Sequence, residues 1–292
     1  MNFVALLETL NSVIWSPALV FLCLAVGVYF TLTTLFLQVR CLPDMMRQIV
    51  SNKKSGSGVS SFESLMISLA GRVGVGNIAG VATAIAFGGP GAVFWMWAMA
   101  LLGSATSFIE CTLAQIYKEK DRDTGEYRGG PAYYIEKAYK HTRAGKFMLV
   151  YAVVFAVAMM LATSYFLPGI QANGVAAAMR NAWGTDVRIS AVVLGILLAV
   201  IIMGGVRRIA NFASLVVPLM AVVYILASIV IMFVNFDRID DVFALIFRSA
   251  FDQEAMFSGM LGAAIMWGVK RGIYSNEAGQ GTGPQSAAAA EV

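Results

Sequence analysis

The chain has 292 residues, of which 59% are hydrophobic and 13% are charged, and its formal net charge is +4. Soluble domains carry roughly 25% charged residues, so this composition excludes a soluble domain and predicts an all-α polytopic membrane protein. The three cysteines, Cys23, Cys41 and Cys111, have no metal-ligand spacing and indicate no disulfide framework. We expect the lipid bilayer as its surroundings and no nucleic-acid partner. No nucleophile-plus-base set is visible inside the apolar segments, so we expect no enzymatic activity.

Apolar runs of about 20 residues, the length that crosses roughly 30 Å of hydrocarbon, predict seven membrane spans. They cover residues 13–37, 64–87, 91–117, 147–171 (extending towards 179), 189–205, 212–234, and a broken span from about 255 to the end. The first apolar run follows Glu8 and no basic segment, which indicates a retained span and not a signal peptide. Residues 129–140 begin with Gly-Gly-Pro and predict an amphipathic helix along the membrane surface.

The loop positions of the 21 basic residues predict the orientation of the spans. One set of alternate loops, which includes residues 118–146, holds 14 of them, and the opposite set holds four. The remaining three, Arg72, Lys270 and Arg271, fall inside the broken spans. Cytoplasmic loops carry the excess of Lys and Arg. We therefore expect a multi-pass protein of the plasma membrane, of the bacterial inner-membrane type, with its N-terminus outside.

A twelve-residue motif occurs twice, at 72–83 and 271–282, with a constant offset of 199 residues. Five positions match in register, namely Arg, Asn, Ala, Gly and Thr. Both copies place glycines and polar residues inside an apolar span, where a helix break is costly unless it lines a site. Glycine-interrupted spans in corresponding positions of two halves indicate the binding site of a secondary transporter. Residues 74–79 also fit a dinucleotide-binding fingerprint, but no strand precedes them and no acid follows about 20 residues on.

The two motifs lie on spans of opposite direction, which is the pattern of an inverted repeat. Residues 64–234 would then be the first five-helix half. Residues 235–292 would be an external loop and the broken first helix of an incomplete second half. Residues 1–63 would be an extra span with a basic cytoplasmic linker.

Four blocks, found in order, resemble the alanine or glycine:sodium symporter family. They are GNIAGVATAIAFGGPGAVFWMW (76–97), GGPAYYI (129–135), QAN (171–173) and SNEAGQGT (275–282). The resemblance implies a LeuT-like inverted repeat, with broken first and sixth repeat helices around a central Na+ and amino-acid site. It also implies sodium-coupled symport of a small neutral amino acid, alanine or glycine, with Na+ as coupling ion and no cofactor. Val75 departs from the small hydroxyl residue of many relatives. The chain stops at Val292, so we expect it to be truncated in the second repeat.

The first break offers groups for both solutes. Free N–H groups at the start of its outer half, together with the positive end of the helix dipole, suit a carboxylate. We place Val75, Gly76 and Asn77 there as substrate-binding residues, because glycine lets the backbone approach closely. Carbonyl oxygens freed on the other side of the break, at Ala70 and Val73, suit a hard cation. The Asn77 side chain can add an oxygen, so Ala70, Val73 and Asn77 are the expected sodium ligands.

The second break, Ser275 to Thr282, is expected to face the first. It would supply substrate-binding oxygens from Ser275, Asn276 and Thr282, with Gly279 giving flexibility. Gln171 reaches the pocket if its long span is tilted, and a position at the rim is the open alternative. For Asn77 and Asn276, the open alternative to ligand binding is a role as hydrogen-bonded links between helices.

Charges at membrane depth indicate function or a specific partner. A cation beside Arg72 would be repelled, so we expect a gating or structural role for Arg72, with Glu110 as a candidate partner. Lys270 or Arg271 is open to pairing with Glu277. Two alternatives to the sodium symporter stay open, a proton-coupled transporter on the same scaffold and an inactive truncated fragment. The oligomeric state is not indicated by the sequence.

Overall fold

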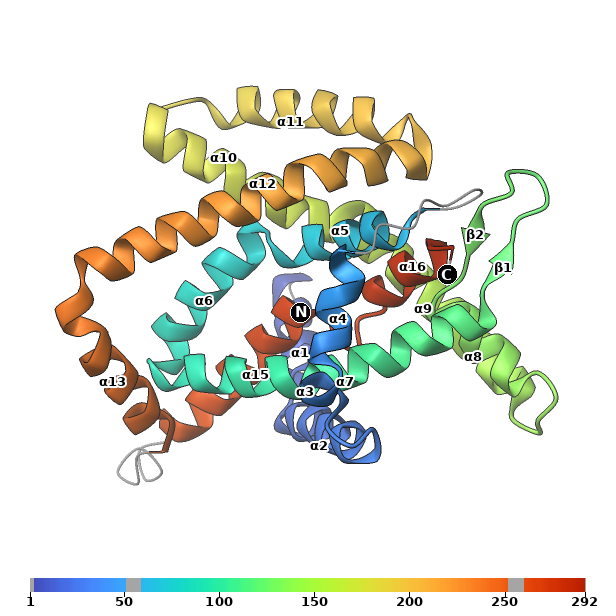
Figure 1. Cartoon of the computed structure of the whole chain (residues 1–292), viewed down its shortest axis with the longest axis horizontal. Helices are drawn as coiled ribbons and strands as arrows, with labels where there is room; N and C mark the ends of the chain where they lie inside the picture. Colours follow the sequence, from blue (N-terminus) through green and yellow to red (C-terminus); the bar gives the residue numbers. More distant parts are fainter. Residues whose placement is uncertain (1–2, 51–58, 252–259, 292) are drawn as a thin grey trace. The chain divides into compact units, whose positions relative to one another are not determined.

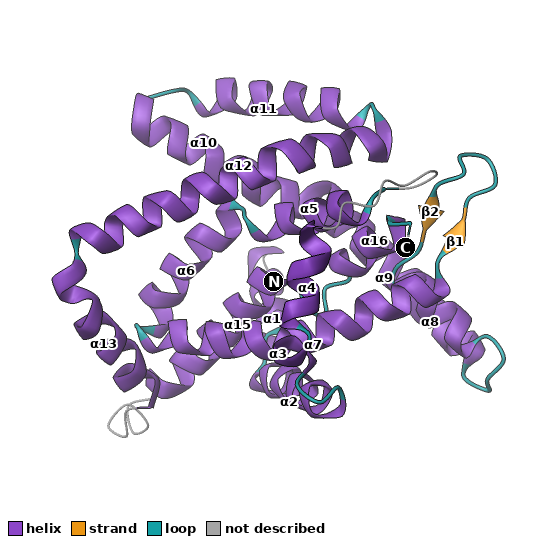
Figure 2. Cartoon of the chain, in the orientation of Figure 1, coloured by secondary structure: helices purple, strands orange, loops and turns teal. Residues whose placement is uncertain are grey.

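The structure is a computed structural model that describes residues 3–50, 59–251 and 260–291. Helices make up most of this part of the chain, in agreement with the predicted all-α polytopic membrane protein (Figure 2). The strands in the described ranges are β1 (Glu119–Lys120) and β2 (Tyr127–Arg128), which pair as an antiparallel hairpin.

Helices follow one another along most of the described chain (Figure 1). In chain order they are α1 (Phe3–Ile14), α2 (Pro17–Thr33), α3 (Leu37–Arg40), α4 (Leu42–Val50), α5 (Ser61–Arg72), α6 (Val75–Gly88), α7 (Gly91–Tyr117), α8 (Pro131–Tyr139), α9 (Gly145–Leu161), the π-helical turn η1 (Ala162–Phe166), α10 (Leu167–Trp183), α11 (Val187–Ile202), α12 (Gly205–Val234), the 3-10 turn η2 (Phe236–Arg238), α13 (Ile239–Phe251), α15 (Met260–Asn276) and α16 (Thr282–Ala289).

Five helical stretches are long and apolar enough to cross a membrane. They are Val4–Thr33, Ser61–Gly88, Gly91–Tyr117, Gly145–Trp183 and Gly205–Val234. Each overlaps a predicted span, and α11, the shorter apolar helix, overlaps the span predicted at 189–205. The start predicted for the last span, at 255, lies outside the described residues.

The fourth stretch is longer than the sequence pattern predicted, because α9, η1 and α10 form one continuous helix of 39 residues. Its π-helical turn directly precedes Pro168, which has no N–H to donate to the preceding turn. Such single π-helical turns often occur at functional sites. The continuation carries Gln171 well inside the helix.

The chain divides into two compact units and passes between them five times, after residues 43, 78, 107, 230 and 279. The first unit comprises residues 1–43, 79–107 and 231–279. Within it, Phe87 near the end of α6 stacks on Trp267 of α15, with 4.9 Å between ring centroids. Its core combines α2, α7 and α15 through Val20, Met99, Val269 and Ile273.

The second unit comprises residues 44–78, 108–230 and 280–292. In it α5 packs against α16, and the Ser64 hydroxyl donates to the Ser286 carbonyl at 2.6 Å. The end of α7 satisfies the carbonyl groups at the end of α16. The Gln115 amide donates to the Ala287 carbonyl, and Lys118 Nζ donates to the Ala290 carbonyl at 2.7 Å. The first unit therefore contains α15 and most of α6, and the second unit contains α5 and α16. The two helical halves of each broken span thus belong mainly to different units.

The predicted surface helix is present as α8, which packs on α9 in the second unit. An ion pair of 2.9 Å between Lys137 Nζ and Glu119 Oε1 links α8 to the hairpin. This contact lowers the pKa of the Glu119 carboxyl. The location of α8 along a membrane surface stays a prediction.

Both predicted helix breaks are present, but they do not occupy corresponding positions of the repeated motif. The first lies at Val73 and Gly74, and the second at residues 277–281. At the offset of 199 residues, Val73 and Gly74 correspond to Gly272 and Ile273, which are inside α15. Asn77 follows its break, whereas Asn276 precedes its own. The five matches in register therefore do not mark structurally equivalent residues.

The second break results from backbone conformations that favour glycine. Gly279 has φ +81° and Gly281 has φ +85°, and Glu277 between α15 and Gly279 also has a positive φ of 55°. An added Cβ at Gly281 would lie 2.7 Å from Phe155 Cζ and 2.8 Å from Pro131 Cγ, whereas one at Gly279 would meet nothing within 4 Å. Gly281 thus meets both a conformational and a steric requirement.

This difference provides a matched pair of substitutions. Gly279→Ala carries only the cost of the left-handed backbone, about 1–2 kcal/mol. Gly281→Ala carries the same cost and a clash in addition, so it is expected to lower the midpoint of thermal unfolding more. Thermal unfolding of the two purified variants, monitored by tryptophan fluorescence, compares them. Equal decreases would show that Phe155 and Pro131 move aside and that their contact with Gly281 is unimportant.

Candidate functional site

The first break has a partner for its leading N–H group. After Arg72 the chain turns at Val73, whose N–H still donates to the Leu69 carbonyl at 2.9 Å, and helix geometry resumes at Val75. The N–H of Val75 donates to Oε1 of Gln171 at 2.9 Å. Gln171 comes from α10, so this long helix brings the Gln171 side chain to the first break, and its part in substrate binding stays a prediction.

Two glycines bring α10 this close. A Cβ at Gly74 would lie 3.0–3.3 Å from the amide atoms of Gln171. A Cβ at Gly174 would lie 2.1 Å from Cγ1 of Val75, which therefore packs on Gly174, one helical turn after Gln171. Val75 thus donates its backbone N–H to Gln171 and packs its side chain on Gly174 of α10. Gly174 was not among the predicted site residues. Its spacing of three residues from Gln171, which places both on one face of a helix, was the signal that could have identified it.

The Asn77 side chain spans the same break. Its Nδ2 donates to the carbonyl oxygen of Arg72, the last residue of α5. An amide group and a helix C-terminal carbonyl thus meet next to the freed carbonyl of Val73. The Arg72 carbonyl lies within the stretch from about Ala70 to Val73 whose carbonyl oxygens are expected to suit a cation. Ala70 lies in the last turn of α5, and Gly76 is buried in the first turn of α6.

The second break is held by Asn276 within the first unit. Its Nδ2 donates to the Met99 carbonyl of α7 at 2.9 Å, and its Oδ1 accepts from the Ala278 N–H at 2.9 Å. Gly103 of α7 leaves space for the Asn276 side chain, because a Cβ at Gly103 would lie 2.3 Å from Asn276 Nδ2. Asn276 therefore links α15 to α7 by a hydrogen bond, which is the alternative role that the sequence left open. Its side chain fixes the shape of the break.

The other predicted residues of this break are placed as follows. Ser275 is in the last turn of α15 and Gly279 is at the centre of the break, both in the first unit. Thr282 is the first residue of α16, in the second unit, and follows the helix-capping Gly281. Within its own unit, the structure brings Val73, Val75, Gly76, Asn77 and Gln171 together at the first break.

The charged residues of the spans have aromatic neighbours. Lys270 Nζ lies 5.0 Å from the ring centroid of Trp15 and 5.3 Å from that of Trp267. The Arg271 guanidinium lies 5.7 Å from the Trp267 centroid, and such cation–π contacts favour a cation in a weakly hydrated place. Arg72 forms none of the ion pairs found among the described residues, and its Nε is buried without a hydrogen-bond partner there.

A double-mutant cycle tests whether α10 shapes the first break through Gly174. Gly174→Ala is expected to lower stability by about 1–3 kcal/mol, the usual cost of overpacking, because the branched Val75 side chain has little rotamer freedom. Val75→Ala removes the clashing methyl groups and should restore most of that loss in the double variant. The free energy of unfolding of the four proteins measures the coupling. Additive effects would mean that the two residues do not meet.

Comparison with known proteins identifies the relatives of the chain. A family model described as the sodium:alanine symporter family matches residues 1–292. The chain is 54% identical over 291 residues to a putative sodium/proton-dependent alanine carrier protein of Bacillus subtilis, covering 100% of this chain and 58% of that protein. It is 45% identical over 282 residues to a probable sodium/glutamine symporter of the same organism, covering 96% and 57%. It is 43% identical over 295 residues to a sodium/alanine symporter of Methanococcus maripaludis, covering 100% and 64%.

The chain thus spans about three fifths of the length of the curated relatives it matches. The match to the family model covers every block on which the resemblance was based. The chain belongs to the sodium:alanine symporter family.

Proposed function

We propose that this chain is part of a symporter that couples Na+ entry to the uptake of a small neutral amino acid, alanine or glycine. The observation that carries the proposal is the geometry of the first break, where a helix N-terminus, a helix C-terminus and two side-chain amides converge. Family membership supports it, and a relative with 43% identity is named a sodium/alanine symporter.

The start of α6 suits the amino-acid carboxylate. Val75 N–H points at Gln171 Oε1, a neutral acceptor. A carboxylate forms stronger, charge-assisted hydrogen bonds than an amide oxygen, and the positive end of the α6 dipole favours it further. The substrate carboxylate would take the place of Gln171 Oε1 on Val75 and reach Gly76. Gln171 would then be free to bind the substrate through its own amide.

The end of α5 suits Na+. The carbonyl groups of Ala70 and Val73 belong to the negative end of that helix, and hard cations prefer oxygen ligands. Asn77 already touches the Arg72 carbonyl through its amide group, and a half-turn of this amide would direct Oδ1 at a cation beside it. The Na+ and the carboxylate would then neutralise each other's charge, so each solute would strengthen binding of the other.

The second break would complete the substrate site through Ser275, Gly279 and Thr282, with Asn276 holding its shape. An inverted repeat of the LeuT type would expose the site alternately to the two sides of the plasma membrane. In this arrangement the N-terminus is outside and the loop 118–146 is cytoplasmic, following the positive-inside rule.

Ion replacement together with one asparagine substitution tests the sodium site. Uptake of labelled alanine into proteoliposomes should require an inward Na+ gradient and disappear when choline replaces Na+. Asn77→Ala should abolish this dependence, and Asn173→Ala, which changes an exposed asparagine of α10, should leave it intact. Retained Na+ dependence in Asn77→Ala would remove Asn77 from the sodium ligands.

A proton-coupled carrier on the same scaffold is the second candidate, because the name of the 54% identical relative mentions both sodium and protons. The same vesicles distinguish the two functions. A sodium symporter loses uptake in choline at constant pH. A proton-coupled carrier keeps it and responds to an inward pH gradient in the absence of Na+.

A further inference from the structure

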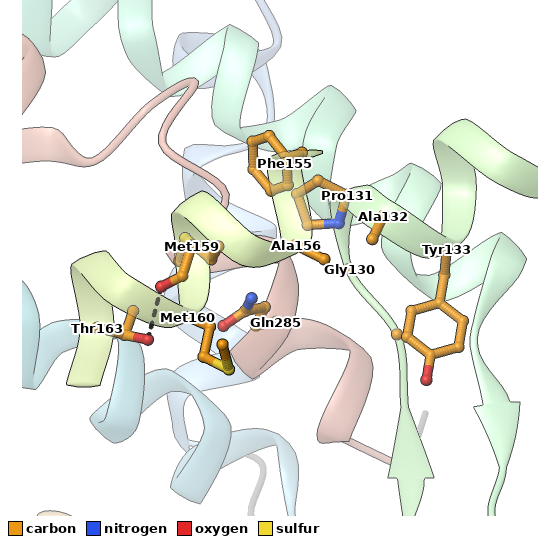
Figure 3. A pocket seen from close by; sticks show the side chains of 11 residues that line it. Gly130, Pro131, Ala132, Tyr133, Phe155, Ala156, Met159, Met160, Thr163 and Gln285 are labelled. Carbon is orange, nitrogen blue, oxygen red and sulfur yellow. Dashed lines mark hydrogen bonds between the residues drawn. The ribbon is translucent and has the colours of Figure 1, made fainter. Parts of the chain in front are cut away.

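A half-open cavity of about 200 Å³ lies within the second unit. It is lined by the start of α8, part of α9 and η1, and one side chain of α16 (Figure 3). Its volume is below the about 300–1,000 Å³ of sites for drug-sized molecules, so it suits a smaller ligand. Nothing in the proposed carboxylate and sodium sites uses it.

The cavity adjoins the second break. Phe155 and Pro131, two of its lining residues, are the same residues that a Cβ at Gly281 would strike. Gly281 caps the N-terminus of α16, and Thr282 follows it. Gln285 of the cavity lies one helical turn beyond Thr282, hence on the same face of α16. A molecule that leaves Thr282 along this face would therefore arrive at Gln285.

Polar and apolar groups both line the cavity, and the two polar side chains, Gln285 and Thr163, belong to exposed residues. Figure 3 shows the Gln285 amide in the middle of the cavity, between Gly130 and the methionines of α9. The Thr163 hydroxyl donates to the Met159 carbonyl at 2.8 Å, so its oxygen can accept from a ligand. Phe155, Met159 and Met160 supply apolar contacts. An amide, a hydroxyl and a small apolar surface match a zwitterion with a short side chain.

Gly130 makes room for Gln285. Its φ of +123° is unfavourable for any side chain, and a Cβ there would lie 3.0 Å from Cγ of Gln285. The Gly-Gly-Pro block, which the family resemblance singled out and which no step of the proposed transport uses, therefore shapes this cavity.

We propose that the cavity is a second binding site for the transported amino acid, on its way to the cytoplasm. The inference rests on the proposed function and orientation. Gln285 and Thr163 bind the polar groups of the substrate, and the methionines and Phe155 contact its side chain.

Protection from alkylation tests the site directly. In a protein whose Cys23, Cys41 and Cys111 are replaced by serine, Met159→Cys places one thiol in the cavity wall, at a residue that is only 8% exposed. Alanine at about ten times its dissociation constant should slow reaction with a maleimide about tenfold, since only the free site reacts. The control is Met203→Cys, which changes a residue that is 85% exposed beyond α11, and its rate should not respond to alanine.

Two further substitutions separate occupancy from a distant conformational effect. Gln285→Leu and Thr163→Val, each combined with Met159→Cys, should lose most of the protection. Unchanged protection in both would overturn the inference, because the effect would then come from the first break. No protection in a protein that takes up alanine with Na+ would also overturn it while leaving the proposed function intact. Protection by phospholipid but not by alanine would identify the cavity as a lipid site and contradict the inference.

Discussion

The backbone of a membrane-spanning helix must satisfy its own hydrogen bonds, and the structure depends on how this constraint is met where two helices are interrupted. At the first interruption the Val75 N–H is satisfied by the Gln171 amide, and the Arg72 carbonyl by the Asn77 amide. These are neutral, replaceable partners. We propose that a carboxylate, a stronger acceptor, replaces the Gln171 amide on Val75 and that a cation replaces the Asn77 amide on the Arg72 carbonyl.

The two interruptions are made by different means, although the sequence motif repeats. The first depends on the close approach of α10, which Gly74 and Gly174 allow. The second depends on left-handed backbone at Gly279 and Gly281 and on Asn276, whose amide is held by α7 and by Ala278. The first is thus open to ligand exchange at its amides, whereas the second is fixed by its own side chain. We propose from this asymmetry that the charged groups of the solutes bind at the first break.

Much of this could be predicted from sequence, because membrane spans and interruptions follow from local composition. Runs of apolar residues predicted the spans, and glycines beside Asn77 and Thr282 predicted the breaks. The register of the breaks could not be predicted, since it depends on packing partners such as Gly174 and Phe155 that lie far along the chain. The sequence left the role of Asn276 open for the same reason, because Met99 accepts its hydrogen bond from 177 residues away. The sodium and substrate ligands stay predictions.

The measurement that tests the central claim most directly is an experimental structure of the protein with Na+ and alanine bound. The account predicts the alanine carboxylate on the N–H groups of Val75 and Gly76, Gln171 turned from Val75 to the substrate, and Na+ beside Asn77 Oδ1. A structure in which Val75 still donates to Gln171 while alanine and Na+ occupy another part of the protein would contradict it.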